Sequence, residues 1–103
     1  MTDHRRAIAK QLIHDAIALL DVADVKDRLT PSDKKVLQES LKKLSVVWRS
    51  LGSISPPGEG HIAAMLSTVA TSLMNCDDPD LKHGVYSEVM KAAEIFEEMS
   101  QDL

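Results

Sequence analysis

The sequence predicts an all-α fold, most simply a four-helix bundle of antiparallel helices joined by short connections. Apolar residues recur at spacings of three and four along most of the chain, which is the period of amphipathic helices, and strand-type residues alternate over no useful length. The 103 residues suffice for one hydrophobic core but not for two. We therefore expect a single all-helical domain covering residues 1–103.

The first helix is expected at about residues 3–23, with Thr2 or Asp3 as its capping residue. Its apolar residues form two neighbouring rows: Ile8, Leu12, Ala16, Leu19 and Ala23 in one, and Ile13, Ile17 and Leu20 in the other. Together the rows cover about half of the helical circumference, which is wider than the stripe that faces one neighbour. This helix should therefore contact two or more others.

The second helix is expected at residues 31–51, because Thr30 offers a capping hydroxyl, Pro31 suits the first helical position and Asp33 follows three residues after the cap. A narrow seam of coiled-coil type runs along it: Leu37, Leu41, Leu44, Trp48 and Leu51. Gly52 is expected to end the helix in a left-handed conformation. The Pro- and Gly-rich stretch that follows, residues 53–60, should form an ordered corner.

The third helix, expected at about residues 60–76, has no charged residue from His61 to Cys76. Half of its circumference is apolar and the other half is small and polar but uncharged. Hydroxyl groups there can donate to the carbonyl four residues earlier, so they do not depend on water, and small residues allow a second backbone to approach. This half is either a solvated Ser/Thr surface or a surface covered by a partner.

The fourth helix is expected at about residues 79–100, with Asp78 as its cap and Pro79 behind it. Its main apolar stripe consists of Leu81, Val85, Val89, Ala92, Phe96 and Met99, and Tyr86 and Met90 widen it. This arc, like those of the first and third helices, is wider than a lone four-helix bundle needs.

Composition bounds the function. The net charge of −4 gives no general attraction to nucleic acid or acidic membranes, and the uncharged stretch is too short for the ~20 apolar residues of a membrane span. One cysteine excludes an internal disulfide, and no apolar signal segment opens the chain. We expect a cytoplasmic protein that does not associate with membranes.

No enzyme motif is present in the sequence: a nucleophile elbow, a phosphate-binding glycine loop and an HExxH motif are all missing. Cys76, Asp77, Asp78 and His83 have ligand chemistry, but their spacing matches neither a zinc site nor an EF-hand loop. We therefore expect no enzyme activity, no cofactor and no metal. Histidine phosphotransfer, with His14 or His83 on a bundle helix, remains a minor alternative.

Five basic residues on the second helix suggest nucleic-acid binding as the rival function: Lys34, Lys35, Lys42, Lys43 and Arg49. Together with Arg5, Arg6 and Lys10 near the N-terminus, these residues could line one positive face despite the acidic total. A solvated lysine face explains them equally simply, and no short helix-turn-helix pair follows, because the Pro-rich corner intervenes.

The excess of neutral helix circumference predicts a protein partner, and a two-fold homodimer is the commonest solution for such a surface. We expect the contact on these residues: Ala64, Thr68, Thr71, Asn75, Ile13, Ile17, Tyr86 and Met90. The sequence thus predicts a small non-enzymatic protein–protein interaction module, of the adaptor, inhibitor or chaperone-like kind.

Overall fold

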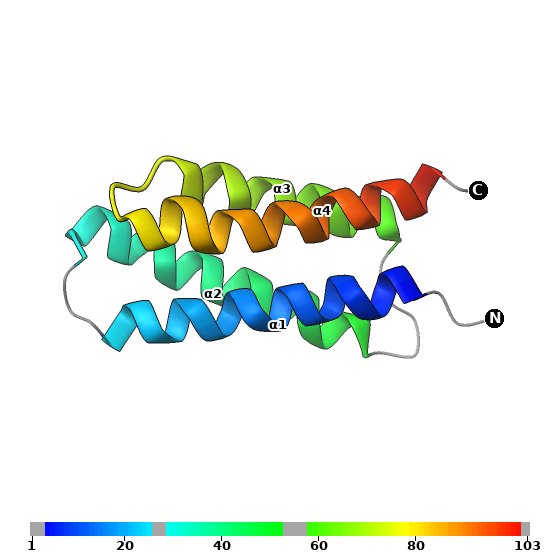
Figure 1. Ribbon diagram of the computed structural model, residues 1–103, viewed down its shortest axis with the longest axis horizontal. Coiled ribbons are helices and arrows are strands. Elements are labelled where there is room, and N and C mark those ends of the chain that lie inside the picture. The colour runs from blue at the N-terminus through cyan, green and yellow to red at the C-terminus, as the bar shows by residue number, and fades with distance from the viewer. Residues whose placement is uncertain (1–3, 26–28, 53–57, 102–103) are drawn as a thin grey trace.

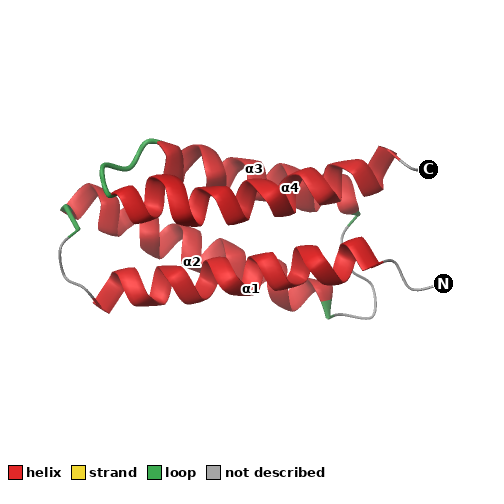
Figure 2. Ribbon diagram, viewed as in Figure 1, coloured by secondary structure: helices red, strands yellow, loops and turns green. Residues whose placement is uncertain are grey.

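The computed structural model describes residues 4–25, 29–52 and 58–101, and shows an all-α bundle, which confirms the predicted fold class (Figures 1 and 2). Four long helices run lengthwise, α1 (His4–Val25), α2 (Pro31–Leu51), α3 (Glu59–Met74) and α4 (Tyr86–Gln101), and a short π-helical segment, η1 (Asp80–Val85), leads into α4. Successive helices pack side by side and α4 closes the ring against α1. The start of α1 and the end of α4 lie at the same end of the bundle (Figure 1).

Local chemistry explains where α2 begins. The Thr30 hydroxyl accepts a hydrogen bond from the Asp33 backbone N–H at 3.1 Å, with Pro31 at the first helical position, as the sequence predicts. The other end differs from the prediction. Gly52 has φ −92° and ψ −1°, which is right-handed, and its N–H donates to the Arg49 carbonyl at 3.1 Å. The expected left-handed cap is therefore wrong, because a tighter last turn ends this helix instead.

The core is a continuous set of aliphatic side chains with Phe96 as its largest member. Every helix contributes to it, and α1 does so mainly through one narrow row: Ala9, Ile13, Ala16, Leu20 and Ala23. The sequence-predicted row containing Ile8 and Leu19 is wrong at these two positions, since they are 55% and 43% exposed. They turn away from the bundle axis because α2 and α4 cover only part of the α1 circumference.

The segment η1 has more residues per turn than an α-helix, just before α4 begins. The Tyr86 N–H points to the Leu81 carbonyl, five residues earlier, and also to the His83 carbonyl, three residues earlier. Leu81, Val85 and Val89, spaced four apart, are all buried. In a continuous α-helix two such steps would drift by about 80°. The wider turn reduces this drift and keeps all three residues on the core side.

Two expected features lie outside the described residues: the Thr2 or Asp3 cap and most of the Pro-rich corner. Where α1 and α3 begin, Arg6 of α1 forms an ion pair with Glu59 of α3, with Nη1 and Oε1 3.5 Å apart. None of the helices in the described ranges has the length and apolar character to cross a membrane.

Candidate interaction surfaces

The outer surface of α3 is uncharged and exposed, as the sequence predicts. Ala64, Thr68, Thr71 and Asn75, which we call the α3 neutral face, are all exposed. The Thr68 and Thr71 hydroxyls donate to the carbonyls four residues earlier at 3.0 and 2.9 Å, and the Asn75 amide donates to the Thr71 carbonyl at 3.1 Å. Because these donors are satisfied within the helix, another molecule could cover this face without leaving them unpaired.

The other predicted contact residues behave differently. Ile13 is fully buried at 0% exposure, so its place on an interaction surface was wrong: it lies in the central row of α1 and fills the core. Ile17, Tyr86 and Met90 are half-buried and pack against the core from its edges. These three side chains pack against the core of the same molecule, so much of the wide apolar surface of α1 and α4 is already covered without a partner.

A second surface appears at the end of α1 and was not recognised in the sequence. Leu19, Val22 and Val25, which we call the α1 apolar patch, are 43%, 54% and 83% exposed. At about 100° per residue, their spacing of three spreads them over about 120° of the helix circumference, outside the core row. The sequence feature that could have revealed this patch is the pair Val22 and Val25, which are apolar but belong to neither of the apolar rows predicted for this helix.

A small hollow lies beside the α1 apolar patch. It has a volume of about 140 Å³, and Leu19, Val22 and Ala23 line it from α1 while Asp80 and Gly84 line it from η1. A Cβ built on Gly84 would meet no atom within 4 Å, so this glycine leaves open space rather than allowing close helix packing. Patch and hollow together form one indented surface that is apolar except for Asp80.

The basic residues of α2 are all exposed, but they do not share one face. Lys34 and Lys43 are nine residues apart, so at about 100° per residue they project from opposite sides of the helix. Lys43, with Lys42, lines a hollow against α3 that also contains Glu39 and Val46, whereas Arg49 lines a hollow against α1. The predicted single positive face is therefore divided.

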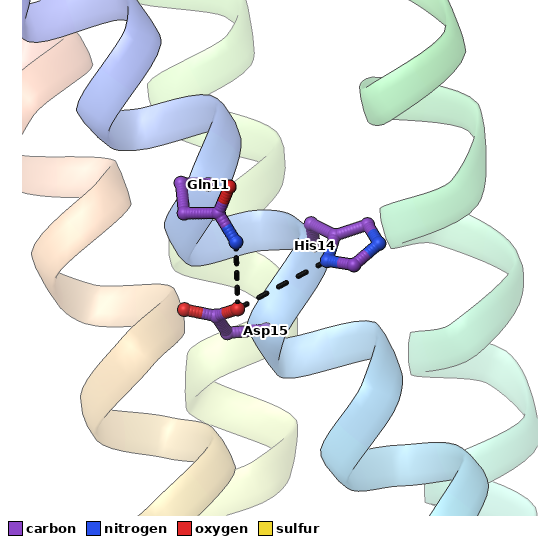
Figure 3. A network of polar contacts seen from close by, with 3 residues as sticks. All are labelled: Gln11, His14 and Asp15. Atoms are coloured by element: carbon purple, nitrogen blue, oxygen red, sulfur yellow. Dashed lines mark hydrogen bonds and ion pairs between the residues drawn. The ribbon is translucent and has the colours of Figure 1, made fainter.

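His14 lies on the exposed side of α1 and its ring points towards α2 (Figure 3). Its Nδ1 lies 3.9 Å from Oδ1 of Asp15, and the same carboxylate oxygen accepts a hydrogen bond from the Gln11 amide at 2.9 Å. His14 also packs against the indole of Trp48, with ring centroids 6.2 Å apart. His83 is exposed within η1, far along the chain from this contact.

The surface between α1 and α2 contains two adjoining hollows, which we call the α1–α2 groove. One, of about 230 Å³, is lined by Ala7, Lys10, Gln11, His14 and Trp48. The other, of about 390 Å³, is lined by His14, Ile17, Ser45, Trp48 and Arg49. Trp48 was expected within the core seam, but it is 36% exposed, because its side chain lies on the side of α2 that faces α1 and lines the groove there.

A buried carboxylate fixes the connection between α3 and η1. Asp33 is 3% exposed, and its oxygens accept hydrogen bonds from the backbone N–H groups of Asp77, at 3.1 and 3.2 Å, and of Asp78, at 2.9 Å. The Asp78 carboxylate in turn accepts from the Leu81 N–H at 3.2 Å, which confirms the predicted cap. The acidic residues here therefore satisfy backbone donors.

Cys76 lies beside this connection and is buried, with 3% exposure. Burial, followed by the negative charge of Asp33, raises the pKa of the thiol from its ordinary value of 9.0 to about 11. The Cys76 thiol donates to the Ser72 carbonyl at 3.7 Å. A thiol held protonated in this way is a poor nucleophile at neutral pH, which agrees with a packing role.

Across the described ranges, no group of three or more His, Cys, Asp or Glu side chains is placed to hold a metal ion. The candidate surfaces are thus the α3 neutral face, the α1 apolar patch and the α1–α2 groove. No protein-family model, curated protein or solved structure matches this chain.

Proposed function

We propose that this protein is a non-enzymatic protein–protein interaction module that forms a two-fold homodimer. The observation that carries the proposal is the α1 apolar patch, where three neighbouring aliphatic side chains are between 43% and 83% exposed. Single exposed apolar residues are normal on protein surfaces, but a group of them beside a hollow is typical of an interaction site.

A second copy is the partner that fits this patch best. In a two-fold contact each residue occurs twice, so Leu19 and Val22 of both copies would contribute together. Burying a Leu or Val side chain completely contributes about 1.5–3 kcal/mol, and these side chains start about half-exposed. Association itself costs several kcal/mol. We therefore expect a dimer of moderate affinity, with a dissociation constant of about 1–100 µM.

The α3 neutral face is a second candidate for the same contact, because its back-bonded hydroxyl groups can be covered without loss. It offers little apolar area, however, since Thr68, Thr71 and Asn75 contribute only small aliphatic portions. The α1 apolar patch would therefore dominate the energy of association, and the α3 neutral face would remain free for another partner.

Sedimentation velocity over a dilution series from about 300 µM to about 0.3 µM tests the proposal. We expect the wild-type protein to shift from dimer to monomer, and the variants Leu19→Glu and Val22→Glu to remain monomeric throughout. Val46→Glu is the matched control, because Val46 is 40% exposed on a different helix and should leave the dimer intact.

A wild-type protein that stays monomeric at the highest concentration would overturn the dimer. Dimers that survive Leu19→Glu but disappear with Thr68→Glu and Thr71→Glu would assign the contact to the α3 neutral face instead. Circular dichroism of each variant establishes that a change in mass does not come from loss of helix.

A further inference from the structure

The α1–α2 groove combines an apolar floor with cationic walls, and its function differs from that of the α1 apolar patch. Ile17 and the Trp48 indole supply the floor, and Trp48 belongs to both hollows. Lys10 borders the groove on α1 and Arg49 borders it on α2. A surface of this kind selects a ligand that is apolar at its centre and negatively charged at its edges.

One of the two cationic groups packs on the indole. The Lys10 ammonium lies 5.1 Å from the centroid of the Trp48 ring, within the range of a cation–π contact. The Arg49 side chain is exposed, and its Nε donates to the Ser45 carbonyl of its own helix at 3.4 Å. Both charges therefore border the α1–α2 groove, where a ligand could reach them.

Among the described residues, none of the side chains that line the two hollows is acidic. The Asp15 carboxylate, next to His14 in sequence, interacts with Gln11 and His14 on its own helix. The groove is thus locally basic on a protein whose net charge is −4. An approaching carboxylate would form charge-assisted hydrogen bonds with these groups.

We propose that the α1–α2 groove binds an acidic amphipathic helix of a partner protein, with an apolar side chain over the Trp48 indole and carboxylates near Lys10 and Arg49. A helix suits the site because the groove runs between two helices that pack side by side, and helices dock into such grooves through apolar residues on one face. The hollows are open along one side, so a small molecule would remain largely exposed there.

A second copy of this chain fits the groove less well. The outer face of α4 is acidic, since Glu94, Glu97 and Glu98 are exposed. Its apolar face, with Val89 and Phe96, is buried in its own core, so it has nothing to place over the indole. The ligand must therefore present an apolar and an acidic face at once.

The sole tryptophan of the chain makes the test direct, because its fluorescence reports on the groove alone. The probe is a synthetic helical peptide of about 18 residues, with Leu along one face, Glu on both flanks and no Trp. We expect it to shift the Trp48 emission and to bind with a dissociation constant below about 100 µM. A peptide with Lys in place of every Glu should bind at least about tenfold more weakly.

Charge reversal in the groove gives the sharper outcome. The double variant Lys10→Glu/Arg49→Glu should bind the acidic peptide at least about tenfold more weakly and should now prefer the Lys peptide. The matched control is Lys35→Glu/Lys91→Glu, which changes the net charge equally at exposed positions outside the groove and should bind like the wild type.

Three results would overturn the proposal: no binding of the acidic peptide up to about 1 mM, equal weakening by both double variants, or tighter binding of a single-stranded oligonucleotide than of the peptide. The dimer test is independent of these results, since the groove variants leave the α1 apolar patch intact and should keep the dissociation constant of the dimer unchanged.

Discussion

The buried carboxylate of Asp33 accepts a hydrogen bond from the backbone N–H of Asp78 at 2.9 Å, across 45 positions of sequence. Because the same side chain also accepts from the Asp77 N–H, the first turn of α2 holds the connection that leads into η1. Asp33, whose position three residues after the Thr30 cap indicates a local capping role, thus also has a long-range structural role.

Replacing Asp33 with Ala should lower the free energy of unfolding by about 2–4 kcal/mol, because two backbone N–H groups lose their acceptor in a buried position. Urea denaturation followed by circular dichroism measures the loss. Asp33→Asn keeps one acceptor oxygen and should recover part of the stability. The control Asp77→Asn changes an exposed side chain, and an equal loss in that variant would contradict this explanation.

Adjacent leucines on α1 should respond very differently to truncation. Leu20 is 0% exposed and Leu19 is 43% exposed. Leu20→Ala should cost about 2–5 kcal/mol at any protein concentration, since it leaves a cavity in the core. Leu19→Ala should cost less than about 1 kcal/mol in dilute protein and more at concentrations where the dimer forms. Thermal denaturation at two concentrations measures both, and similar losses in the two variants would contradict the assigned burial.

The Cys76 thiol makes stability depend on alkaline pH. Its pKa is raised to about 11 in the folded chain, against 9.0 ordinarily, so the unfolded state loses its proton first as the pH rises. This contribution is complete below about pH 9 and is lost as the pH rises through 11. Cys76→Ala should therefore show a shallower decline of the unfolding free energy across that window than the wild type, as measured by urea denaturation at each pH.

The same thiol should react slowly with iodoacetamide. Only the thiolate attacks, and at pH 8 a pKa near 11 leaves far less of it than a free thiol would have. Mass spectrometry over time should give a rate at least about a hundredfold below that of the urea-unfolded chain. A folded rate close to the unfolded one would contradict the burial of Cys76.

Gly84→Ala should raise the free energy of unfolding by about 0.5–1 kcal/mol, because alanine restricts the unfolded chain and its Cβ would meet no atom within 4 Å. Gly52→Ala is the comparison, since Gly52 lies beyond the last turn of α2 and gains less from helix propensity. A loss of stability in Gly84→Ala would contradict the prediction that the added Cβ is accommodated without strain.

The helices of this bundle were predictable because their signals are local. Thr30, Pro31 and Asp33 mark the start of α2 through capping chemistry that involves neighbouring residues. Asp78 marks the entry to η1 in the same way. The small polar residues of α3 likewise satisfy one another within four positions, so their hydrogen bonds follow from spacing.

The surfaces were less predictable, because they depend on how far each helix is rotated towards its neighbours. A wheel places Leu19 near the apolar row and Trp48 within the seam, but the bundle exposes part of both. The π-helical turn could not be predicted from apolar spacing, because Leu81, Val85 and Val89 have the spacing of four that an ordinary α-helix also shows. The contact of Asp33 with the α3–η1 connection depends on tertiary packing, which no local pattern encodes.

The π-helical turn also makes the chain tolerant of a change in length. A hydrogen bond across five residues encloses one residue more than the usual bond across four, and this ring contains Gly84, which has no side chain to displace. Deleting that residue would close the ring to an ordinary turn while α4 keeps its place. The entrance of the last helix should thus tolerate the loss of one residue without disturbing the core.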